Sequence, residues 1–368
     1  MQYLILVNVK MYRNILVNAL VNLGDVVLTT SAIALIKQNY PETRITMLVK
    51  GVVADAVRNN PVVDDVIVFD YKAKENSLSK MKAMVKELRR RDFDLSISFD
   101  RKLRPALLTY LARIPTRVGP NKVFDDNKSK VTWLYTDVVN IDHDLNQTLQ
   151  AQTYQTIVRK FFNIEGSAEP IFARITAEDK AKVDELFARL PSSKLKIALC
   201  VKGTFSLKTW PKEYFVEVVK HLAESYDAAF YIVGAPSDKE YADEVIAAIK
   251  TSNSELRIPN YALENFCGET SLIDLAAIFK RSDLLVTVDT GATHIAATTG
   301  VKMVTMYGCT SPDRWHPISN NAMVFTSRES CCPCSVKAEE CPSWPKPKCL
   351  YSVTPEMIID ACDKLLNK

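Results

Sequence analysis

Short apolar runs and amphipathic stretches alternate along this chain. In the first half, four apolar runs have the length of buried strands, at residues 14–20, 44–49, 66–69 and 95–100. Apolar positions recur at the spacing of a helix face at residues 26–40, 52–59, 79–90 and 143–162, whereas residues 124–141 show no clear period. Strands that alternate with helices over short links predict a parallel, doubly wound sheet.

The alternation begins again after the Pro-Ser-Ser stretch at 191–193, which follows a charge-rich helix predicted at 177–190. Strands are predicted at residues 197–201, 229–233, 284–288 and 303–307, and helices at 213–224, 239–250, 292–299 and 355–366. The pattern predicts an α/β chain of two Rossmann-like domains that face a cleft, at residues 1–190 and 191–353. The last helix, within residues 354–368, is expected to pack back across the domain junction.

The composition limits the class of protein. A chain of 368 residues exceeds one ordinary domain, and 47% apolar with 24% charged residues is typical of a soluble globular protein. The net charge of +4 is too small to predict a nucleic-acid partner, although it suits an anionic substrate or an acidic membrane surface. No apolar run approaches the ~20 residues that span a bilayer.

The first ten residues are apolar but have neither a basic leader nor a small-residue cleavage site. We interpret them as an overhang and Met11 as a candidate start. Without an export signal the expected compartment is the reducing cytoplasm, where the nine cysteines would not form disulfides. Four of them are expected to be ordinary buried cysteines: Cys200, Cys267, Cys309 and Cys362.

A candidate anion-binding turn follows the strand predicted at 284–288. It contains Asp289, Thr290 and Gly291 and leads into a helix that carries His294. The carboxyl end of a strand and the amino end of a helix meet here, so unpaired N–H groups favour the phosphate of a nucleotide. The structural alternatives are that Thr290 or Thr293 caps the helix and that a carbonyl satisfies a buried His294.

A second candidate turn follows the first strand. Gly24 permits a close turn of the backbone, and Asp25 is expected at the mouth of the cleft, unless it only caps the helix. After the fourth strand come Arg101, Lys102 and Arg104, followed by two more arginines, Arg113 and Arg117. Such charges usually form a solvated face, but at the end of a strand they are also candidates for binding an acceptor phosphate or carboxylate.

Two common nucleotide-binding motifs are missing from the sequence. No G-x-G-x-x-G follows either first strand, which disfavours a dinucleotide-dependent dehydrogenase, and no G-x-x-x-x-G-K-[ST] is found, which disfavours a P-loop NTPase. The remaining interpretation is a transferase or epimerase that uses a nucleotide as a leaving group or handle.

Four motifs, taken together, resemble glycosyltransferase family 9, the heptosyltransferases that build the inner core of lipopolysaccharide. The motifs are Asn22-Leu-Gly-Asp-Val-Val-Leu-Thr29, Lys208-Thr-Trp-Pro211, Gly268-Glu-Thr-Ser-Leu272, and Asp289-Thr-Gly-Ala-Thr-His294 with Tyr307-Gly308. Their order and spacing carry the resemblance, which extends from about Asn14 to Tyr307. Ser31 departs from it, since the family usually has proline there.

The resemblance implies a GT-B fold and inverting transfer of heptose from ADP-L-glycero-β-D-manno-heptose, without a metal or other cofactor, at the inner face of the cytoplasmic membrane. It implies that Asp25 is the catalytic base and that Lys208 binds the donor phosphates. Further donor-binding residues implied by the resemblance are Thr204 for phosphate, Asp238 for ribose, and Asp289, Thr290, Gly291 and His294 in the turn. Inversion needs a base on the acceptor side and a stabilised leaving group on the other, which Asp25 and Lys208 suit.

A cysteine-rich insert at residues 331–349 leaves a question open. It contains Cys331, Cys332, Cys334, Cys341 and Cys349. Four thiolates can bind zinc or iron, but this spacing is irregular compared with paired C-x-x-C knuckles, and no metal ligands are assigned. Two other functions therefore remain: transfer of heptose or another glycosyl group to a protein, and a thiol or metal-binding sensor without turnover.

Overall fold

A computed structural model describes residues 11–70, 77–99, 102–122, 127–253, 263–327, 329–334 and 337–367. The first ten residues, interpreted above as an overhang, lie outside this set, as does Arg101. The chain forms two compact units, divided between Ala173 and Arg174. Within the described residues, no helix combines the length and the apolar composition needed to cross a membrane.

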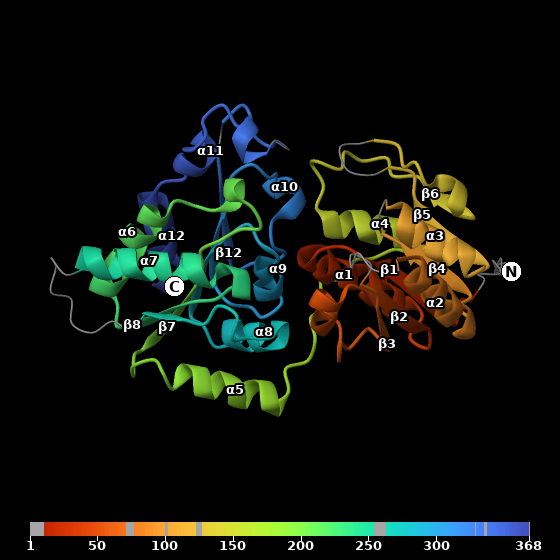
Figure 1. Ribbon diagram of the computed structural model, residues 1–368, viewed down its shortest axis with the longest axis horizontal. Helices are drawn as coiled ribbons and strands as arrows, with labels where there is room; N and C mark the ends of the chain where they lie inside the picture. Colours follow the sequence, from red (N-terminus) through yellow and green to blue (C-terminus); the bar gives the residue numbers. More distant parts are fainter. Residues whose placement is uncertain are drawn as a thin grey trace, which may run out of the picture. The chain divides into compact units, whose positions relative to one another are not determined.

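The first unit is built on a parallel sheet of six strands (Figure 1). Its strands are β1 (Asn14–Ala19), β2 (Arg44–Val49), β3 (Asp65–Val68), β4 (Leu95–Ser98), β5 (Thr116–Pro120) and β6 (Asp137–Val139). Their order is β3-β2-β1-β4-β5-β6, so the direction of winding reverses between β1 and β4. In such sheets ligands bind at the carboxyl ends of the strands beside this reversal.

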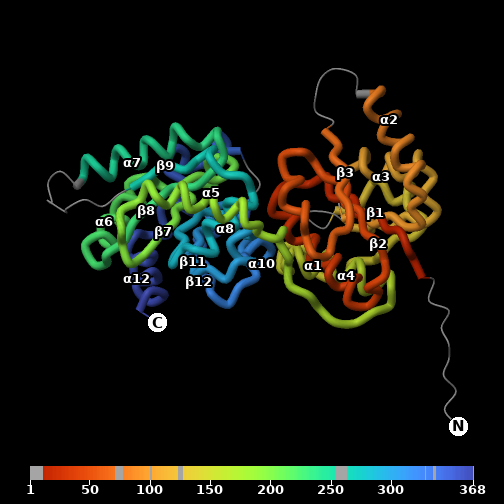
Figure 2. Tube along the Cα trace, turned by 90° about the horizontal axis from the view of Figure 1, so that it is seen from below, coloured from red at the N-terminus to blue at the C-terminus, as the bar shows by residue number. Residues whose placement is uncertain are grey.

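Helices cover both faces of the first sheet. They are α1 (Leu23–Asn39), α2 (Ser77–Arg90), α3 (Leu103–Leu111) and α4 (Gln150–Phe162), with short 3-10 turns η1 (Gly51–Ala56) and η3 (Thr132–Leu134). In Figure 2, α2 and α3 lie on one side of the sheet and α1 and α4 on the other. Residues 26–36 of α1 are buried on every side, and Thr29, Thr30 and Ser31 satisfy their hydroxyls by donating to carbonyls three residues earlier. Serine therefore fits within α1 without interrupting it.

The second unit repeats this architecture. Its parallel strands are β7 (Leu195–Cys200), β8 (Ala228–Ile232), β9 (Leu263–Asn265), β10 (Leu284–Val288), β11 (Met303–Tyr307) and β12 (Ala322–Thr326), in the order β12-β11-β10-β7-β8-β9. The winding reverses between β7 and β10. The helices are α5 (Ala177–Phe187), α6 (Lys212–Ser225), α7 (Lys239–Asn253), α8 (Leu272–Lys280), α9 (Gly291–Ala297), α10 (Pro312–Trp315), α11 (Lys348–Tyr351) and α12 (Pro355–Leu366).

The terminal helix α12 is seated in the core of the second unit. Ile358, Ala361, Cys362 and Leu365 belong to the same buried cluster as the apolar side chains of α6, and α12 packs against α6, β10 and β11. The sequence predicted that this helix packs back across the domain junction. Within its own unit, its apolar face packs against a helix and two strands.

The division between the units falls earlier than the sequence suggested. We expected the first domain to include α5 and to end at residue 190, but the compact first unit ends at Ala173. The reason is that α5 packs on α8, where Lys182 Nζ lies 2.5 Å from the buried carboxylate of Asp274. Phe187 also contacts Tyr231 of β8, with ring centroids 5.3 Å apart.

Candidate active site

The loop after β7 carries the first group of site residues. Trp210 anchors it, because this side chain is fully buried and its Nε1 donates a hydrogen bond of 2.9 Å to the carbonyl of Val353. The short turn η4 (Ser206–Lys208) then places Lys208 close to Gly203. A Cβ atom on residue 203 would lie 2.4 Å from Lys208 Cβ and 2.7 Å from Lys208 O, so the loop requires glycine there.

Lys208 and Asp289 form a largely buried ion pair. Lys208 Nζ lies 2.6 Å from Asp289 Oδ2, and the two side chains are 16% and 7% exposed. Thr310 Oγ1 donates a 2.5 Å hydrogen bond to the same carboxylate oxygen, and Lys208 Nζ also lies 5.3 Å from the centre of the Phe205 ring. An ammonium group has three N–H donors, so Lys208 can hold Asp289 and still donate to phosphate oxygens.

The pair lies at the winding reversal of the second sheet. Lys208 belongs to the loop after β7 and Asp289 directly follows β10, and these two strands are neighbours in the sheet. Because parallel strands end at the same edge, residues far apart in sequence meet there. The structure therefore brings together two of the residues that the motifs singled out.

The turn after Asp289 starts α9. Thr290 is the N-cap residue with extended backbone, but its side chain makes no capping hydrogen bond, and Gly291 is the first helical residue. Thr293 Oγ1 instead donates to the carbonyl of Val288 at 3.2 Å. Neither threonine acts as the side-chain cap considered above. The first N–H groups of a helix have no partner inside the helix, which makes this turn suited to an anion.

His294 is buried in α9 and its Nδ1 has no hydrogen-bond partner in the described part of the chain. The carbonyl expected to satisfy it is therefore not found at Nδ1. Burial lowers the pKa of His294 to about 4, against the opposing effect of Asp289, so the ring is neutral near pH 7. A neutral imidazole ring whose Nδ1 has no partner can form a hydrogen bond with a ligand bound at this turn.

Asp238 and Thr204 complete the residues expected in this unit. Asp238 ends the short turn η5 (Pro236–Asp238), where its Oδ2 accepts a 2.9 Å hydrogen bond from Ala235 N and its Oδ1 lies 3.5 Å from Lys202 Nζ. Thr204 is exposed in the loop after β7. Asp238 thus follows β8, the strand next to β7, at the same edge of the sheet as Lys208 and Asp289.

In the first unit, Asp25 lies in the first turn of α1. The N-cap is Asn22, so the alternative that Asp25 caps the helix is wrong. Tyr154 of α4 donates a 2.7 Å hydrogen bond from its hydroxyl to Asp25 Oδ1, and its ring packs 5.0 Å from that of Phe99. Tyr154 was not identified from the sequence, because a tyrosine on the apolar face of a helix looks like any core residue.

The basic residues after β4 divide into two groups. Lys102 is exposed as the N-cap of α3, and Arg104 is half-buried in the first turn of that helix. Both follow β4, the neighbour of β1 at the winding reversal, and so lie at the same sheet edge as Asp25. Arg117 has a structural role instead, since its guanidinium donates to the carbonyls of Ile114 and Leu134 at 2.6 and 2.8 Å.

The cysteine-rich insert packs beside Cys309, which follows the carboxyl end of β11. Cys331 and Cys332 have sulfurs 4.0 Å apart, Cys349 is buried, and Cys334 N donates 2.8 Å to the carbonyl of Cys309. Burial, with Cys334 close by, raises the pKa of the Cys309 thiol to about 12. Over the ranges that the structure describes, no three His, Cys, Asp or Glu side chains are arranged to hold a metal ion.

Comparison with known proteins identifies the family. A model described as glycosyltransferase family 9 (heptosyltransferase) matches residues 81–344, which is more than half of the sequence. The chain belongs to glycosyltransferase family 9. This family 9 chain is therefore a glycosyltransferase of the heptosyltransferase type, and the predicted family and enzyme class are confirmed.

Individual relatives have low sequence identity to this family 9 chain, but they match it over nearly its full length. A lipooligosaccharide heptosyltransferase 2 of Campylobacter jejuni is 24% identical over 350 residues, which cover 94% of this chain and 96% of that protein. The structure of the E. coli ADP-heptose LPS heptosyltransferase II matches with a TM-score of 0.78 and 20% identity, over 96% of this chain and 98% of that one. A family 9 glycosyltransferase of Veillonella parvula matches with a TM-score of 0.79 and 22% identity, over 97% of both chains. The predicted GT-B fold class is confirmed by these structures.

Replacing Gly203 with alanine tests how the family 9 enzyme positions Lys208. The added methyl group would overlap Lys208, so we expect a loss of about 1–3 kcal/mol in the free energy of unfolding, together with weaker ADP binding. Urea unfolding and calorimetric titration with ADP measure the two effects. At Gly300 a Cβ would contact nothing within 4 Å, although φ is +79°. Gly300→Ala should therefore lower stability without changing ADP affinity, and equal ADP affinity in Gly203→Ala would contradict this account.

The buried His294 predicts a pH dependence of stability. The unfolded chain binds a proton on this histidine below a pH of about 6.5, whereas the folded enzyme does so only below a pH of about 4. Stability is therefore complete above the unfolded pKa and falls as the pH drops through this window, by on the order of 3 kcal/mol. Urea unfolding between pH 7.5 and pH 4 should show this component in the wild type and lack it in His294→Gln. Identical pH profiles would show that His294 has the same pKa in the folded and unfolded chain, which would contradict this account.

Proposed function

We propose that this enzyme transfers heptose from ADP-L-glycero-β-D-manno-heptose to the inner core of lipopolysaccharide, with inversion and without a metal. The observation that carries the proposal is the Lys208–Asp289 pair at the winding reversal of the second sheet. A lysine beside a helix start at this edge suits a sugar nucleotide's diphosphate. The names of the relatives favour heptose and the adenine nucleotide, since one is an ADP-heptose heptosyltransferase and another acts on lipooligosaccharide.

Asp25 is the base in the proposed reaction. Its carboxylate takes the proton of the acceptor hydroxyl while that oxygen bonds to the anomeric carbon from the face opposite the leaving group. The bond from the anomeric carbon to the β-phosphate oxygen breaks with its electron pair, and ADP leaves. The hydroxyl of Tyr154, 2.7 Å from Asp25 Oδ1, holds the carboxylate in place. Tyr154 is therefore a positioning residue.

The second unit stabilises the departing ADP. Negative charge develops on the β-phosphate as the bond breaks, and the ammonium of Lys208 with the N–H groups at Thr290 and Gly291 can balance it. These groups take the part that a divalent cation has in other transferases. We assign Thr204 to a phosphate oxygen, Asp238 to the ribose hydroxyls, and neutral His294 to a hydrogen bond with the donor.

The acceptor side is proposed for the first unit. Lys102 and Arg104, at the same sheet edge as Asp25, are suited to acidic groups of the core saccharide, and Arg101 precedes them in sequence. Because the acceptor is a lipid conjugate, the enzyme is expected to work at the inner face of the cytoplasmic membrane. Its net charge of +4 suits an anionic surface.

The test is direct. Purified enzyme is incubated with ADP-heptose and heptose-deficient lipopolysaccharide, with and without a chelator, and the product is analysed by mass spectrometry and by NMR of the anomeric proton. We expect the acceptor to gain one heptose of inverted configuration, with the same yield in chelator. UDP- and GDP-sugars serve as controls. A polypeptide that gains the heptose would instead support the protein-acceptor alternative, and unconsumed ADP-heptose would refute the proposal.

A further inference from the structure

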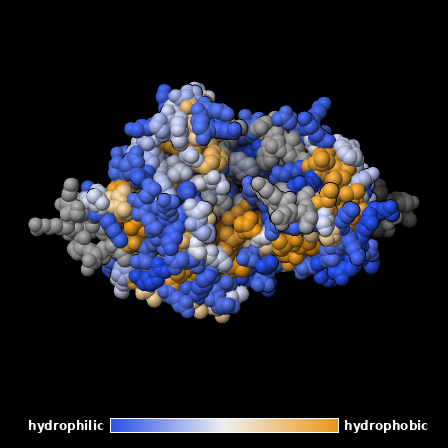
Figure 3. Space-filling model, in the orientation of Figure 1, coloured by the Kyte–Doolittle hydropathy of each residue, from blue (hydrophilic) through white to orange (hydrophobic). Residues whose placement is uncertain are grey.

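An exposed apolar face lies on α3 in the first unit. Leu103, Leu107, Tyr110 and Leu111 recur at the spacing of one side of this helix, and all but the half-buried Leu107 are exposed. Trp133 of η3 is 66% exposed, and the centre of its ring lies 6.3 Å from that of Tyr110. Figure 3 shows apolar surface over α3 on this side of the first unit. We call these five side chains the α3 face.

The α3 face is not the side that holds the helix on its sheet. Leu108, which faces inward, is buried in a cluster with Leu88 of α2 and Leu16 of β1. A surface helix normally presents polar residues to water. The neighbouring helix α2 does so, because its exposed residues include five basic ones: Lys80, Lys82, Lys86, Arg89 and Arg90. Exposed apolar side chains that lie together, rather than singly, indicate a contact surface.

Positive charge gathers beside the α3 face. Residues 102–136, which include it, contain seven basic and two acidic residues, a net charge of +5, whereas the whole chain carries +4. Arg113 follows α3 and Lys130 precedes η3, and both side chains are exposed. Arg89 of α2 lies against the end of α3, where its Nη2 donates a 2.7 Å hydrogen bond to the carbonyl of Leu111. The partner of this face should therefore combine an apolar interior with negative charge at its surface.

An anionic lipid bilayer has this combination. Tryptophan and tyrosine favour the boundary between headgroups and acyl chains, where the ring is apolar and its N–H or O–H reaches water. Leucines beside them enter the acyl layer, and lysine and arginine bind the headgroup phosphates. A second copy of the chain fits less well, since it would bring two positive surfaces together. Each side of a stable protein interface also contributes roughly 20–30 residues, which is far more than the α3 face provides.

We propose that the α3 face docks the enzyme on the anionic surface of a lipid bilayer. Helix α3 starts after the carboxyl end of β4, so Leu103 lies at the sheet edge that carries Asp25. Docking through α3 would therefore keep the edge with the proposed base close to the membrane. That consequence rests on the proposed function, in which the acceptor is a lipid conjugate, whereas the docking itself rests on the exposed side chains and their charge.

The test is binding of the full chain to vesicles, without donor or acceptor. The protein is sedimented with vesicles of phosphatidylcholine alone, or of phosphatidylcholine mixed with phosphatidylglycerol, at increasing salt. We expect binding to the mixed vesicles that weakens as salt rises. Trp133→Gln with Leu111→Gln should weaken this binding about tenfold or more. Arg113→Gln with Lys130→Gln should weaken it about fivefold for each charge removed.

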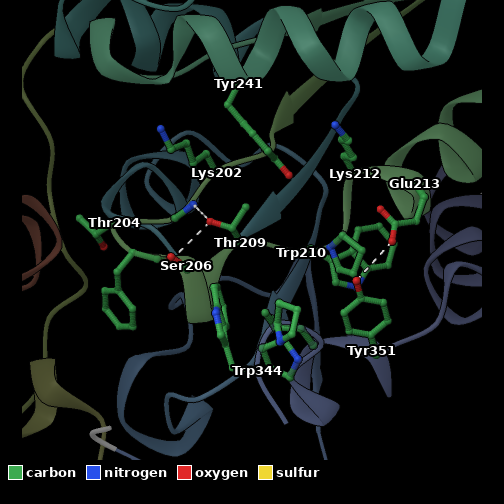
Figure 4. A pocket seen from close by; sticks show the side chains of 16 residues that line it. Lys202, Thr204, Ser206, Thr209, Trp210, Lys212, Glu213, Tyr241, Trp344 and Tyr351 are labelled. Carbon is green, nitrogen blue, oxygen red and sulfur yellow. Dashed lines mark hydrogen bonds between the residues drawn. The ribbon is translucent and has the colours of Figure 1, made fainter. Parts of the chain in front are cut away.

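Matched controls come from the second unit. Trp344→Gln with Met357→Gln removes two exposed apolar side chains, of which Trp344 lines a pocket of about 470 Å³ beside the loop after β7 (Figure 4). Lys180→Gln with Lys194→Gln removes two exposed charges. Both control variants should bind vesicles like the wild type. Circular dichroism verifies that every variant is folded.

A kinetic arm separates docking from catalysis. With ADP-heptose as donor, Trp133→Gln with Leu111→Gln should raise KM for heptose-deficient lipopolysaccharide embedded in mixed vesicles, and should leave kcat and the KM for deacylated core oligosaccharide unchanged. If ADP-heptose is not a substrate, the proposed function fails and vesicle binding still tests the docking surface. Docking is overturned if the wild type does not bind mixed vesicles or if all variants bind them equally. A wild-type dimer that the same variant dissociates in sedimentation velocity would also overturn it, and would assign the α3 face to a second copy of the chain.

Discussion

The Asp25→Asn enzyme is expected to transfer heptose on the order of 10² to 10⁴ times more slowly than the wild type, with nearly unchanged affinity for ADP-heptose and acceptor. Asparagine has the size of aspartate and still accepts the hydrogen bond from Tyr154, but it cannot take the proton of the acceptor hydroxyl. The fall should therefore appear in kcat and leave KM for both substrates in place. Steady-state kinetics with both substrates varied, together with circular dichroism to verify folding, provide the measurement.

Two further variants test whether the fall in kcat of the Asp25→Asn enzyme is specific to the carboxylate of Asp25. Asp55→Asn removes an exposed carboxylate of the same unit, paired with Arg58 at 2.9 Å, and should retain wild-type kcat. Tyr154→Phe removes only the hydroxyl that holds Asp25, so we expect a smaller fall of about tenfold and an altered pH profile of kcat. A fully active Asp25→Asn enzyme would show that another group is the base.

The Lys208→Gln enzyme is expected to lose about 10² to 10³-fold in kcat/KM for the donor. The ammonium is the cation that the proposal assigns to the diphosphate, and glutamine cannot balance the charge that develops on the leaving group. The change also leaves the 7% exposed carboxylate of Asp289 without its ion-pair partner. An unpaired buried charge is costly, so the melting temperature should fall as well.

The double variant Lys208→Gln with Asp289→Asn separates the two effects. Its amide groups can hydrogen-bond each other, so thermal unfolding should recover toward the wild-type midpoint, whereas transfer should remain impaired. Lys194→Gln, at an exposed lysine of the same unit, is the matched control for charge and should leave both readouts unchanged. Recovery of activity together with stability would mean that Lys208 acts only through folding.

The position of a strand within its sheet explains why three strands were missed in the sequence. The predicted strands at β10 and β11 are observed with the predicted bounds, because each is a five-residue run that is buried throughout. The strands β6, β9 and β12 lie at sheet edges, where β6 and β9 have three residues each and β12 is only half-buried. Figure 3 shows how polar and apolar surface mix over the face of the molecule that it presents. A short run with one covered face lacks the continuous apolar pattern that marks a central strand.

Two observed segments also differ from the helices that the sequence predicted. The helix expected at residues 52–59 is the 3-10 turn η1, Gly51–Ala56, and the helix expected from residue 143 begins only at Gln150. Helix propensity over a few residues is a weak determinant, and tertiary contacts decide whether a turn continues. The first strand of each unit, by contrast, enters a buried parallel sheet and could be located from its apolar run alone.

The sequence by itself determined the α/β class, the repeated architecture and the family, and it predicted Asp25, Lys208 and Asp289 as candidate site residues, since strand and helix periodicities and turn motifs are local. Only the tertiary structure decided which residues are partners: Lys208 with Asp289, Asp25 with Tyr154, and Tyr110 with Trp133. The physical reason is that these contacts depend on the order of strands within a sheet and on helix packing over it. Both are set by the burial of whole faces, which no short stretch of sequence specifies.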